Sequence, residues 1–127
     1  GLRPGSLDGG LAPALRDLAR RAPVPVDVRA TDARFDADLE TAAYFMACEG
    51  LTNAIKHARA TRVVLIAHHE RDRLIVTISD DGVGGARAEG GSGLTGLGDR
   101  IASHRGTLVI DSDKDGTTLT AELPCGS

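Results

Sequence analysis

Two pairs of strand-like segments, each pair joined by a short polar turn, limit most strongly what this chain can fold into. Residues 62–69 and 73–80 alternate apolar and polar side chains and are separated by three residues, a length suited to a tight hairpin. Residues 107–111 and 117–123 are also strand-like, and residues 112–116 between them have the Ser, Asp and Gly content of a turn. Such short connections imply antiparallel pairing within one sheet.

Apolar residues at helical spacing mark the elements that should cover this sheet. Residues 7–22 show this spacing before two prolines, and residues 36–58 form the longest element without a proline. A further strand is expected over residues 24–28, and a short helix over residues 95–104 that ends at Gly106, a natural residue for the position after a helix. Because the helices are amphipathic, all of them should lie on one face, which predicts a two-layer α/β sandwich.

The composition fits one globular domain and excludes several kinds of partner. A chain of 127 residues has the usual length of a single domain and can bury a real core. Aromatic residues make up only 2%, which excludes stacking platforms for single-stranded nucleic acid, and a net charge of −3 gives no electrostatic case for DNA. Two cysteines favour a reducing compartment. The first residues are typical of a domain cut from a longer protein, so residues 1–127 are expected to be one such domain.

The central helix is predicted to carry a polar stripe in its last turns. At about 100° per residue, Asn53, Lys56 and His57 lie within about 80° of Glu49, whereas Ile55 lies on the far side. A helix face that changes from apolar to polar partway along suggests that it lines something wet or charged. A solvated helix end with a charge pair explains the same stripe about equally well.

Two polar residues at strand ends are predicted to point toward the core side of the sheet. A period of two places Asp80 on the same face as the three apolar residues of its strand, where its carboxylate needs a donor. Thr117 begins the last strand in the same inward register. Together they could hold a heteroaromatic amine by hydrogen bonds. The plainer readings are an Asp-Gly turn at residues 81–82 and a threonine chosen for its strand propensity.

Glycines are concentrated between the first hairpin and the short helix. Residues 82–93 hold six of them, and residues 91–96 read Gly-Ser-Gly-Leu-Thr-Gly at the helix start. Glycines let the backbone approach phosphate oxygens, and the free N–H groups of a helix start favour anions. The run also fits the dinucleotide-binding pattern, with Asp111 at about the right distance for a ribose contact. That reading fails because no buried strand precedes the run and no βαβ series follows it.

Taken together, these segments resemble the ATP-binding catalytic domain of two-component sensor histidine kinases. This domain belongs to the GHKL superfamily, with type II topoisomerases, mismatch-repair ATPases and a heat-shock chaperone. Residues 49–58 (EGLTNAIKHA) resemble its N box, and residues 80–84 (DDGVG) resemble its first glycine box, with Asp81 at a position where Asn is often found. Residues 91–97 (GSGLTGL) resemble the second glycine box, and residues 116–117 resemble the terminal Gly-Thr pair. The run of motifs is most similar to nitrate-responsive and thermosensing kinases. The resemblance implies the Bergerat fold, a mixed sheet covered on one face by about three helices.

The resemblance also implies how ATP and Mg²⁺ would be held. Asn53 would help to coordinate Mg²⁺, Asp80 would accept a hydrogen bond from the adenine amino group, and Thr117 would support the adenine through water. Catalysis would then be mostly positioning, together with neutralisation of the phosphate charge by the metal.

The remaining motif residues would surround the phosphates. Lys56 and His57 would lie beside the phosphate chain, and Glu49 would orient the attacking group. The backbone would approach the nucleotide at four glycines and at the helix start, namely Gly82, Gly84, Gly93, Gly96 and Leu94.

The implied function is phosphoryl transfer from Mg-ATP to a histidine on a separate helical dimerisation domain, with a response regulator downstream. None of the four histidines lies in such a segment, so this cytoplasmic domain is expected to be a monomer that cannot autophosphorylate alone, within a homodimeric parent. Two alternatives use the same fold: an anti-sigma-factor serine kinase, and a regulatory binding module that has lost ATP. A gyrase-like ATPase is disfavoured because the chain lacks a transducer domain.

Overall fold

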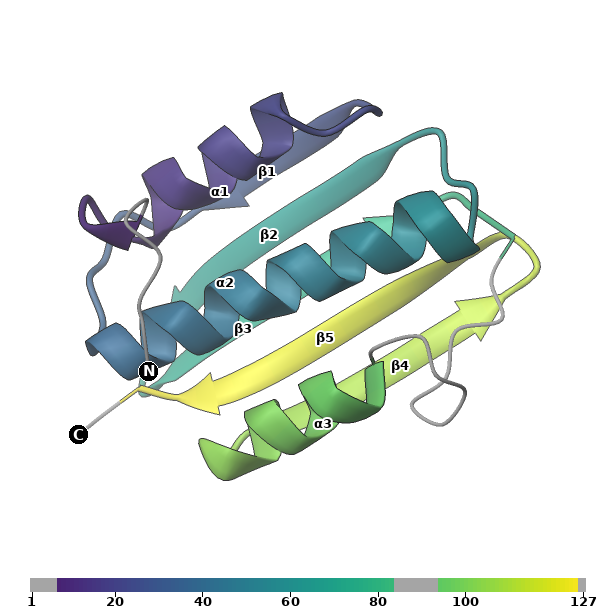
Figure 1. Ribbon diagram of the computed structural model, residues 1–127. Helices are drawn as coiled ribbons and strands as arrows, with labels where there is room; N and C mark the ends of the chain where they lie inside the picture. Colours follow the sequence, from purple (N-terminus) through teal and green to yellow (C-terminus); the bar gives the residue numbers. More distant parts are fainter. Residues whose placement is uncertain (1–6, 84–93, 126–127) are drawn as a thin grey trace.

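A five-stranded sheet with its helices on one face forms the protein in the computed structural model, which describes residues 7–83 and 94–125 (Figure 1). The strand order is β1-β2-β3-β5-β4. The strands are β1 (Val26–Ala30), β2 (Val63–Glu70), β3 (Arg73–Asp80), β4 (Thr107–Asp113) and β5 (Gly116–Pro124). Strand β1 pairs with β2 in parallel, and the other neighbours are antiparallel, so the sheet is mixed.

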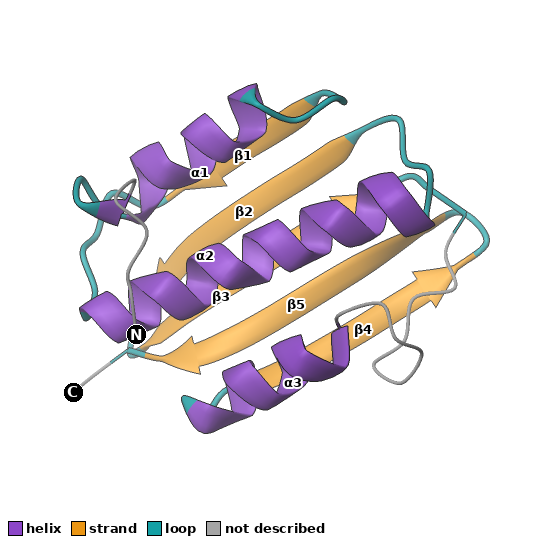
Figure 2. Ribbon diagram, viewed as in Figure 1, coloured by secondary structure: helices purple, strands orange, loops and turns teal. Residues whose placement is uncertain are grey.

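The helical layer is arranged around one central helix. Helix α2 (Ala37–Thr52) lies between α1 (Leu11–Arg20) and α3 (Leu94–Ser103), and it also contacts β3 and β5 (Figure 2). With neighbours on three sides, α2 is apolar around most of its circumference. It continues into a short π-helix, η2 (Asn53–His57). The predicted two-layer sandwich is therefore confirmed.

The core between the two layers is aliphatic. Strands β3 and β5 bury every second residue against the helices, as the period of two predicts. Both predicted hairpins are present, and residues 73–80 match β3 at both ends. Strand β1 is the parallel exception because its connection to β2 runs through α2, and parallel strands need such a crossover.

Several predicted boundaries differ from the structure, and three of the differences have clear local reasons. Helix α1 begins at Leu11 instead of residue 7, because Gly10 before it has a φ of 104° and is not helical. Strand β1 begins at Val26, after both prolines, since a proline has no N–H to donate to the sheet. The central helix does not run unchanged to residue 58, because its hydrogen bonding widens at Asn53.

The end of α3 also differs from the sequence prediction. The residue with left-handed backbone after the helix is Arg105, with a φ of 62°, and not Gly106. Gly106 is needed for space: a Cβ there would lie 2.6 Å from the carbonyl oxygen of Glu122 and 2.8 Å from Cδ2 of Leu123. The glycine therefore lets the turn pack directly against β5.

An ion pair between a buried carboxylate and an exposed arginine fixes the start of α2. The carboxylate of Glu40 is fully buried and accepts hydrogen bonds from Nε of Arg34 at 3.0 Å and from the backbone N–H of Phe35 at 3.3 Å. Arg34 lies against Gly10, where a Cβ would approach its Cδ to 2.9 Å. The pair thus holds the starts of α1 and α2 and the loop before α2 together.

Candidate functional site

Close packing at Gly50 places the end of α2 over the end of β3. A Cβ at Gly50 would lie 3.1 Å from Cδ1 of Ile78 and would overlap its Cγ2. Ile78 is two residues before Asp80 on the same face of β3, and Gly50 is almost one helical turn before Asn53. The helix therefore crosses the strand so that Asn53 follows directly toward the Asp80 end.

The helix becomes a π-helix at Asn53. The backbone N–H of Ala58 donates to the carbonyl of Asn53 at 2.9 Å, which is an i to i+5 bond. Such widened turns are frequent at functional sites. The Asn53 side chain is only 2% exposed, and its amide forms no hydrogen bond with any residue in the described ranges 7–83 and 94–125. Because buried amides are normally hydrogen-bonded, this one is available to a ligand or metal ion.

Asp80 ends β3 with its carboxylate held by the turn that follows. Its Oδ1 accepts a hydrogen bond from the backbone N–H of Gly82 at 2.8 Å. Burial raises the pKa of Asp80 above its ordinary value, and the N–H groups of Gly82 and Thr117 partly oppose this shift. A half-buried carboxylate of this kind is ready to accept a hydrogen bond from a ligand N–H.

Thr117 lies directly opposite Asp80 in the β3–β5 register, and it has the inward orientation that the sequence predicted. It is 2% exposed, and its hydroxyl is 2.8 Å from Oγ of Ser112. Gly116 before it has a φ of 150°, and a Cβ there would overlap the carbonyl oxygen of Asp80. The glycine is therefore required for β5 to start this close to the end of β3.

Gly82 joins the end of β3 to the end of the π-helix. A Cβ at Gly82 would lie 2.6 Å from Cβ of Ala58 and would overlap the Ala58 carbonyl oxygen. The next residue, Val83, donates its backbone N–H to that same oxygen at 2.9 Å. The segment that carries Asp80 and the π-helix that begins with Asn53 are thus in direct contact.

Asp81, for which the sequence indicated no role beyond a turn and a place in the first glycine box, forms a three-bond link across the fold. Its Oδ1 accepts hydrogen bonds from the backbone N–H groups of Thr61 at 2.8 Å and Arg62 at 3.0 Å, and its Oδ2 accepts one from the Thr61 hydroxyl at 2.5 Å. These donors hold the pKa of Asp81 below its ordinary value. No local pattern signals this link, because its partners lie 19 and 20 residues away.

The predicted polar stripe on α2 is only partly present. Lys56 and His57 are exposed and Glu49 is partly exposed, unlike the buried Asn53. Lys56 lines a depression of about 480 Å³ between α1 and α2, together with Ile55, which was predicted to lie on the opposite side. The prediction assumed 100° per residue, whereas each residue of the wider π-turn advances less, which rotates Lys56 toward α1.

Both glycine boxes lie only partly within the described residues. Gly84 and Gly93 fall outside them. Leu94 begins α3 and is fully buried. Gly96 is exposed, and a Cβ added there would have no described heavy atom within 4 Å. Packing within the described part of the chain therefore gives no reason for a glycine at this position.

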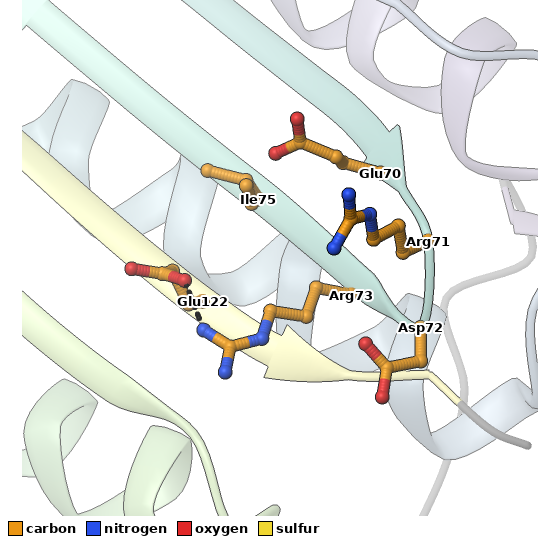
Figure 3. A pocket seen from close by; sticks show the side chains of 6 residues that line it. All are labelled: Glu70, Arg71, Asp72, Arg73, Ile75 and Glu122. Atoms are coloured by element: carbon orange, nitrogen blue, oxygen red, sulfur yellow. Dashed lines mark hydrogen bonds and ion pairs between the residues drawn. The ribbon is translucent and has the colours of Figure 1, made fainter.

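A charged cavity of about 360 Å³ lies at the opposite end of β3 from Asp80. Figure 3 shows the ion pair between Nη1 of Arg73 and Oε1 of Glu122, 2.6 Å apart, across this cavity. The lining residues are Glu70, Arg71, Asp72, Arg73, Ile75 and Glu122. Three acidic and two basic side chains are mixed in this lining, so the cavity does not present one charge to a ligand, and the glycine-box end remains the candidate site. Among the described residues no cluster of His, Cys, Asp or Glu could hold a metal ion by itself.

Comparisons with known proteins agree with the geometry. Residues 38–127 match the family described as "Histidine kinase-, DNA gyrase B-, and HSP90-like ATPase". The sensor histidine kinase MctS of Rhizobium johnstonii is 36% identical over 97% of this chain, and UhpB of Salmonella typhimurium, a signal transduction histidine-protein kinase/phosphatase, is 37% identical over 97%. The chain spans 30% and 26% of the length of these relatives.

A solved structure shows the same fold. The blue-light activated histidine kinase EL346 of Erythrobacter litoralis has a TM-score of 0.75 and 25% identity, over 91% of this chain and 39% of that one. No helix in the described part of the present chain is long and apolar enough to cross a membrane. The predicted resemblance is confirmed: the chain belongs to the histidine kinase-, DNA gyrase B- and HSP90-like ATPase family, and it corresponds to the ATP-binding catalytic domain of sensor histidine kinases.

Proposed function

We propose that this domain binds Mg-ATP and supplies its terminal phosphoryl group to a histidine on a separate dimerisation domain of the same protein. A response regulator would then take the phosphoryl group. The observation that supports this proposal best is the contact at Gly82, which joins the segment bearing Asp80 to the π-helix that begins with Asn53. One ligand could therefore meet the half-buried Asp80 carboxylate and the buried Asn53 amide, which forms no hydrogen bond within residues 7–83 and 94–125.

Each end of the nucleotide has a suitable partner in this arrangement. The Asp80 carboxylate would accept a hydrogen bond from the adenine amino group, and Thr117 would support the base through water. The Asn53 side-chain oxygen suits Mg²⁺, which prefers oxygen ligands and usually keeps several waters beside phosphate oxygens. The bound metal would neutralise charge on the phosphates.

The phosphate side of the proposal rests on the helix start and on exposed residues. The free N–H groups at the start of α3, beginning at Leu94, would face the phosphates. Lys56, His57 and Glu49 stay proposals for the phosphate chain and the attacking group; Lys56 would have to leave the α1 side of α2 to take part. Gly84 and Gly93 stay predicted backbone contacts.

Calorimetry with ATP, with and without Mg²⁺, tests the site. Asn53→Ala should remove the gain in affinity that Mg²⁺ provides, and Asp80→Asn should reduce the preference for ATP over GTP. Glu122→Gln makes the same carboxylate-to-amide change at the far end of the sheet and should bind as the wild type does. Wild-type binding by both site variants would reject the assignment.

Gly96 offers an independent test, because packing among the residues that the structure describes does not require a glycine there. Gly96→Ala should keep or raise stability by up to about 1 kcal/mol through better helix propensity. It should nevertheless weaken Mg-ATP binding, because the methyl group would occupy space that the nucleotide needs. Gly98→Ala in the same helix, where a Cβ would only touch Leu108 at 4.0 Å, is the matched control and should bind normally. Equal affinity of both variants would argue against a contact at Gly96.

Phosphotransfer itself needs the rest of the protein. We expect this domain to run as a monomer in size-exclusion chromatography, to reside in the cytoplasm, and to acquire no stable label from γ-labelled ATP when alone. Label should appear when a segment with the acceptor histidine is present. Labelling of serine on a partner protein would instead support the anti-sigma-factor kinase alternative, and complete failure to bind ATP would support a regulatory module.

A further inference from the structure

The Asp81 side chain closes a loop around the end of the π-helix. The chain leaves η2 at Ala58 and reaches Thr61 and Arg62, whose N–H groups both donate to Oδ1 of Asp81. From Asp81 the chain continues to Val83, whose N–H returns to the Ala58 carbonyl at 2.9 Å. The carboxylate therefore adds a side-chain link between two segments that the Val83–Ala58 bond and the pairing of β2 with β3 also join.

This link bears directly on the unusual turn that presents Asn53. π-Helical turns are rare and need support from their surroundings. Here the turn is completed by the bond from Ala58 to Asn53 and by a bond from the Ala60 N–H to the Ala54 carbonyl at 2.8 Å. Both bonds lie in the segment that the Asp81 link and Gly82 hold against β3.

We propose that Asp81 is a positioning residue of the nucleotide site, which holds the π-turn against Gly82 so that Asn53 and Asp80 face the same ligand. The identity of that ligand rests on the proposed function. The hydrogen bonds that define the role do not depend on it. Asp81 touches neither the base nor the metal in this proposal; it acts through the backbone of residues 58–62.

The chemistry of the link predicts which substitutions preserve it. Asp81 uses one oxygen for two backbone N–H groups and the other for the Thr61 hydroxyl. An asparagine can accept both N–H groups with its carbonyl oxygen and donate its NH₂ to the Thr61 hydroxyl, which accepts as readily as it donates. An alanine preserves none of the three bonds. Geometry, and not negative charge, is therefore what the position requires.

The test compares Asp81→Asn, Asp81→Ala and the control Glu122→Ala, which removes a bonded carboxylate at the far end of the sheet. Affinity for Mg-ATP is measured by calorimetry well below the lowest melting temperature of the set. Asp81→Ala should weaken binding by about 10–100-fold, the usual cost of removing a residue that orients a ligand-holding group. Asp81→Asn and Glu122→Ala should stay within about twofold of the wild type.

Amide hydrogen exchange provides a second readout that does not need nucleotide. In Asp81→Ala the N–H groups of Ala58 and Val83 should exchange faster, while the central β3 amides keep wild-type protection. Asp81→Asn should restore slow exchange at both positions. If the wild-type chain fails to bind ATP, the proposed function is wrong, and exchange at these two amides still decides the positioning role.

Three results would overturn the inference. The first is wild-type affinity in Asp81→Ala, and the second is wild-type exchange at Ala58 and Val83 in that variant. The third is an equal loss in Asp81→Asn, which would show that charge and not geometry matters. A loss in Asp81→Ala that Asp81→Asn rescues, with the control unchanged, would support the role.

Discussion

Replacing Gly82 with alanine should damage the site and the fold together. The added Cβ would lie 2.6 Å from Cβ of Ala58 and 2.8 Å from its carbonyl carbon, whereas ordinary contacts begin near 3.4 Å. The two segments must then separate by at least about 0.8 Å, because the added Cβ would also overlap the Ala58 carbonyl oxygen. Because the obstacle is backbone, no side-chain rotation can relieve it. The shift would break the bond from Val83 to Ala58 and strain the bond from Gly82 to Asp80.

The cost of this change follows from its two parts. Overpacking costs about 1–3 kcal/mol, and a lost backbone hydrogen bond adds about 1 kcal/mol, so the free energy of unfolding should fall by about 2–4 kcal/mol. At about 4 °C per kcal/mol, the melting temperature should fall by about 8–16 °C. Thermal unfolding followed by circular dichroism measures this change. Gly98→Ala, in which the new Cβ would lie 4.0 Å from Leu108, is the control and should melt at or above the wild-type temperature.

Mg-ATP binding by Gly82→Ala should also be lost at temperatures where the variant is folded. The reasoning would be refuted if Gly82→Ala melted within about 2 °C of the wild type. It would equally be refuted if a destabilised Gly82→Ala bound Mg-ATP normally, because the contact with Ala58 would then not align the site.

Further substitutions test other parts of the description. Gly50→Ala should gain about 1 kcal/mol from helix propensity and lose about 1–3 kcal/mol from overpacking against Ile78. Urea unfolding should therefore show that the free energy of unfolding falls by up to about 2 kcal/mol. A clear increase would contradict the close contact between α2 and β3. Asp80→Asn should raise the melting temperature without nucleotide at neutral pH. Because burial raises the pKa of Asp80, the folded state binds a proton at this carboxylate more tightly than the unfolded state does. The stability of the wild type should therefore rise as the pH falls through the pKa of folded Asp80. Thermal melts at several pH values should show that Asp80→Asn lacks this pH-dependent gain in stability. Arg105→Gly removes a side chain from left-handed backbone and should stabilise by about 0.5–1 kcal/mol in the same urea assay, whereas destabilisation would contradict the assigned φ.

The sequence predicted the helices and strands in which apolar residues recur at a regular spacing. The period of two and the short turn defined β3 at both ends, and the same period gave the inward orientation of Asp80 and of Thr117 within their own strands. Helical spacing identified all three α-helices, although α1 starts later than predicted because Gly10 leaves helical backbone. Each of these features depends on residues close to one another along the chain.

Features that depend on distant contacts could not be predicted in this way. The π-turn at Asn53 is held by Gly82 and Asp81, which follow it by almost thirty residues. The prediction that used 100° per residue therefore placed Lys56 in the polar stripe, whereas its side chain lies toward α1. Gly106 was interpreted as a helix end, whereas a backbone oxygen of β5 requires it. The residues of the predicted site are present, but their roles stay predictions until nucleotide binding is measured.

The mutual contact of residues 58–62 with residues 80–83 matters for protein engineering. A chimera that takes its central helix from a related kinase inherits that kinase's backbone path after the helix, and this path must fit the recipient's first glycine box. Grafts should therefore exchange the two segments as one cassette. Grafts of the helix alone should give folded proteins with poorly formed nucleotide sites.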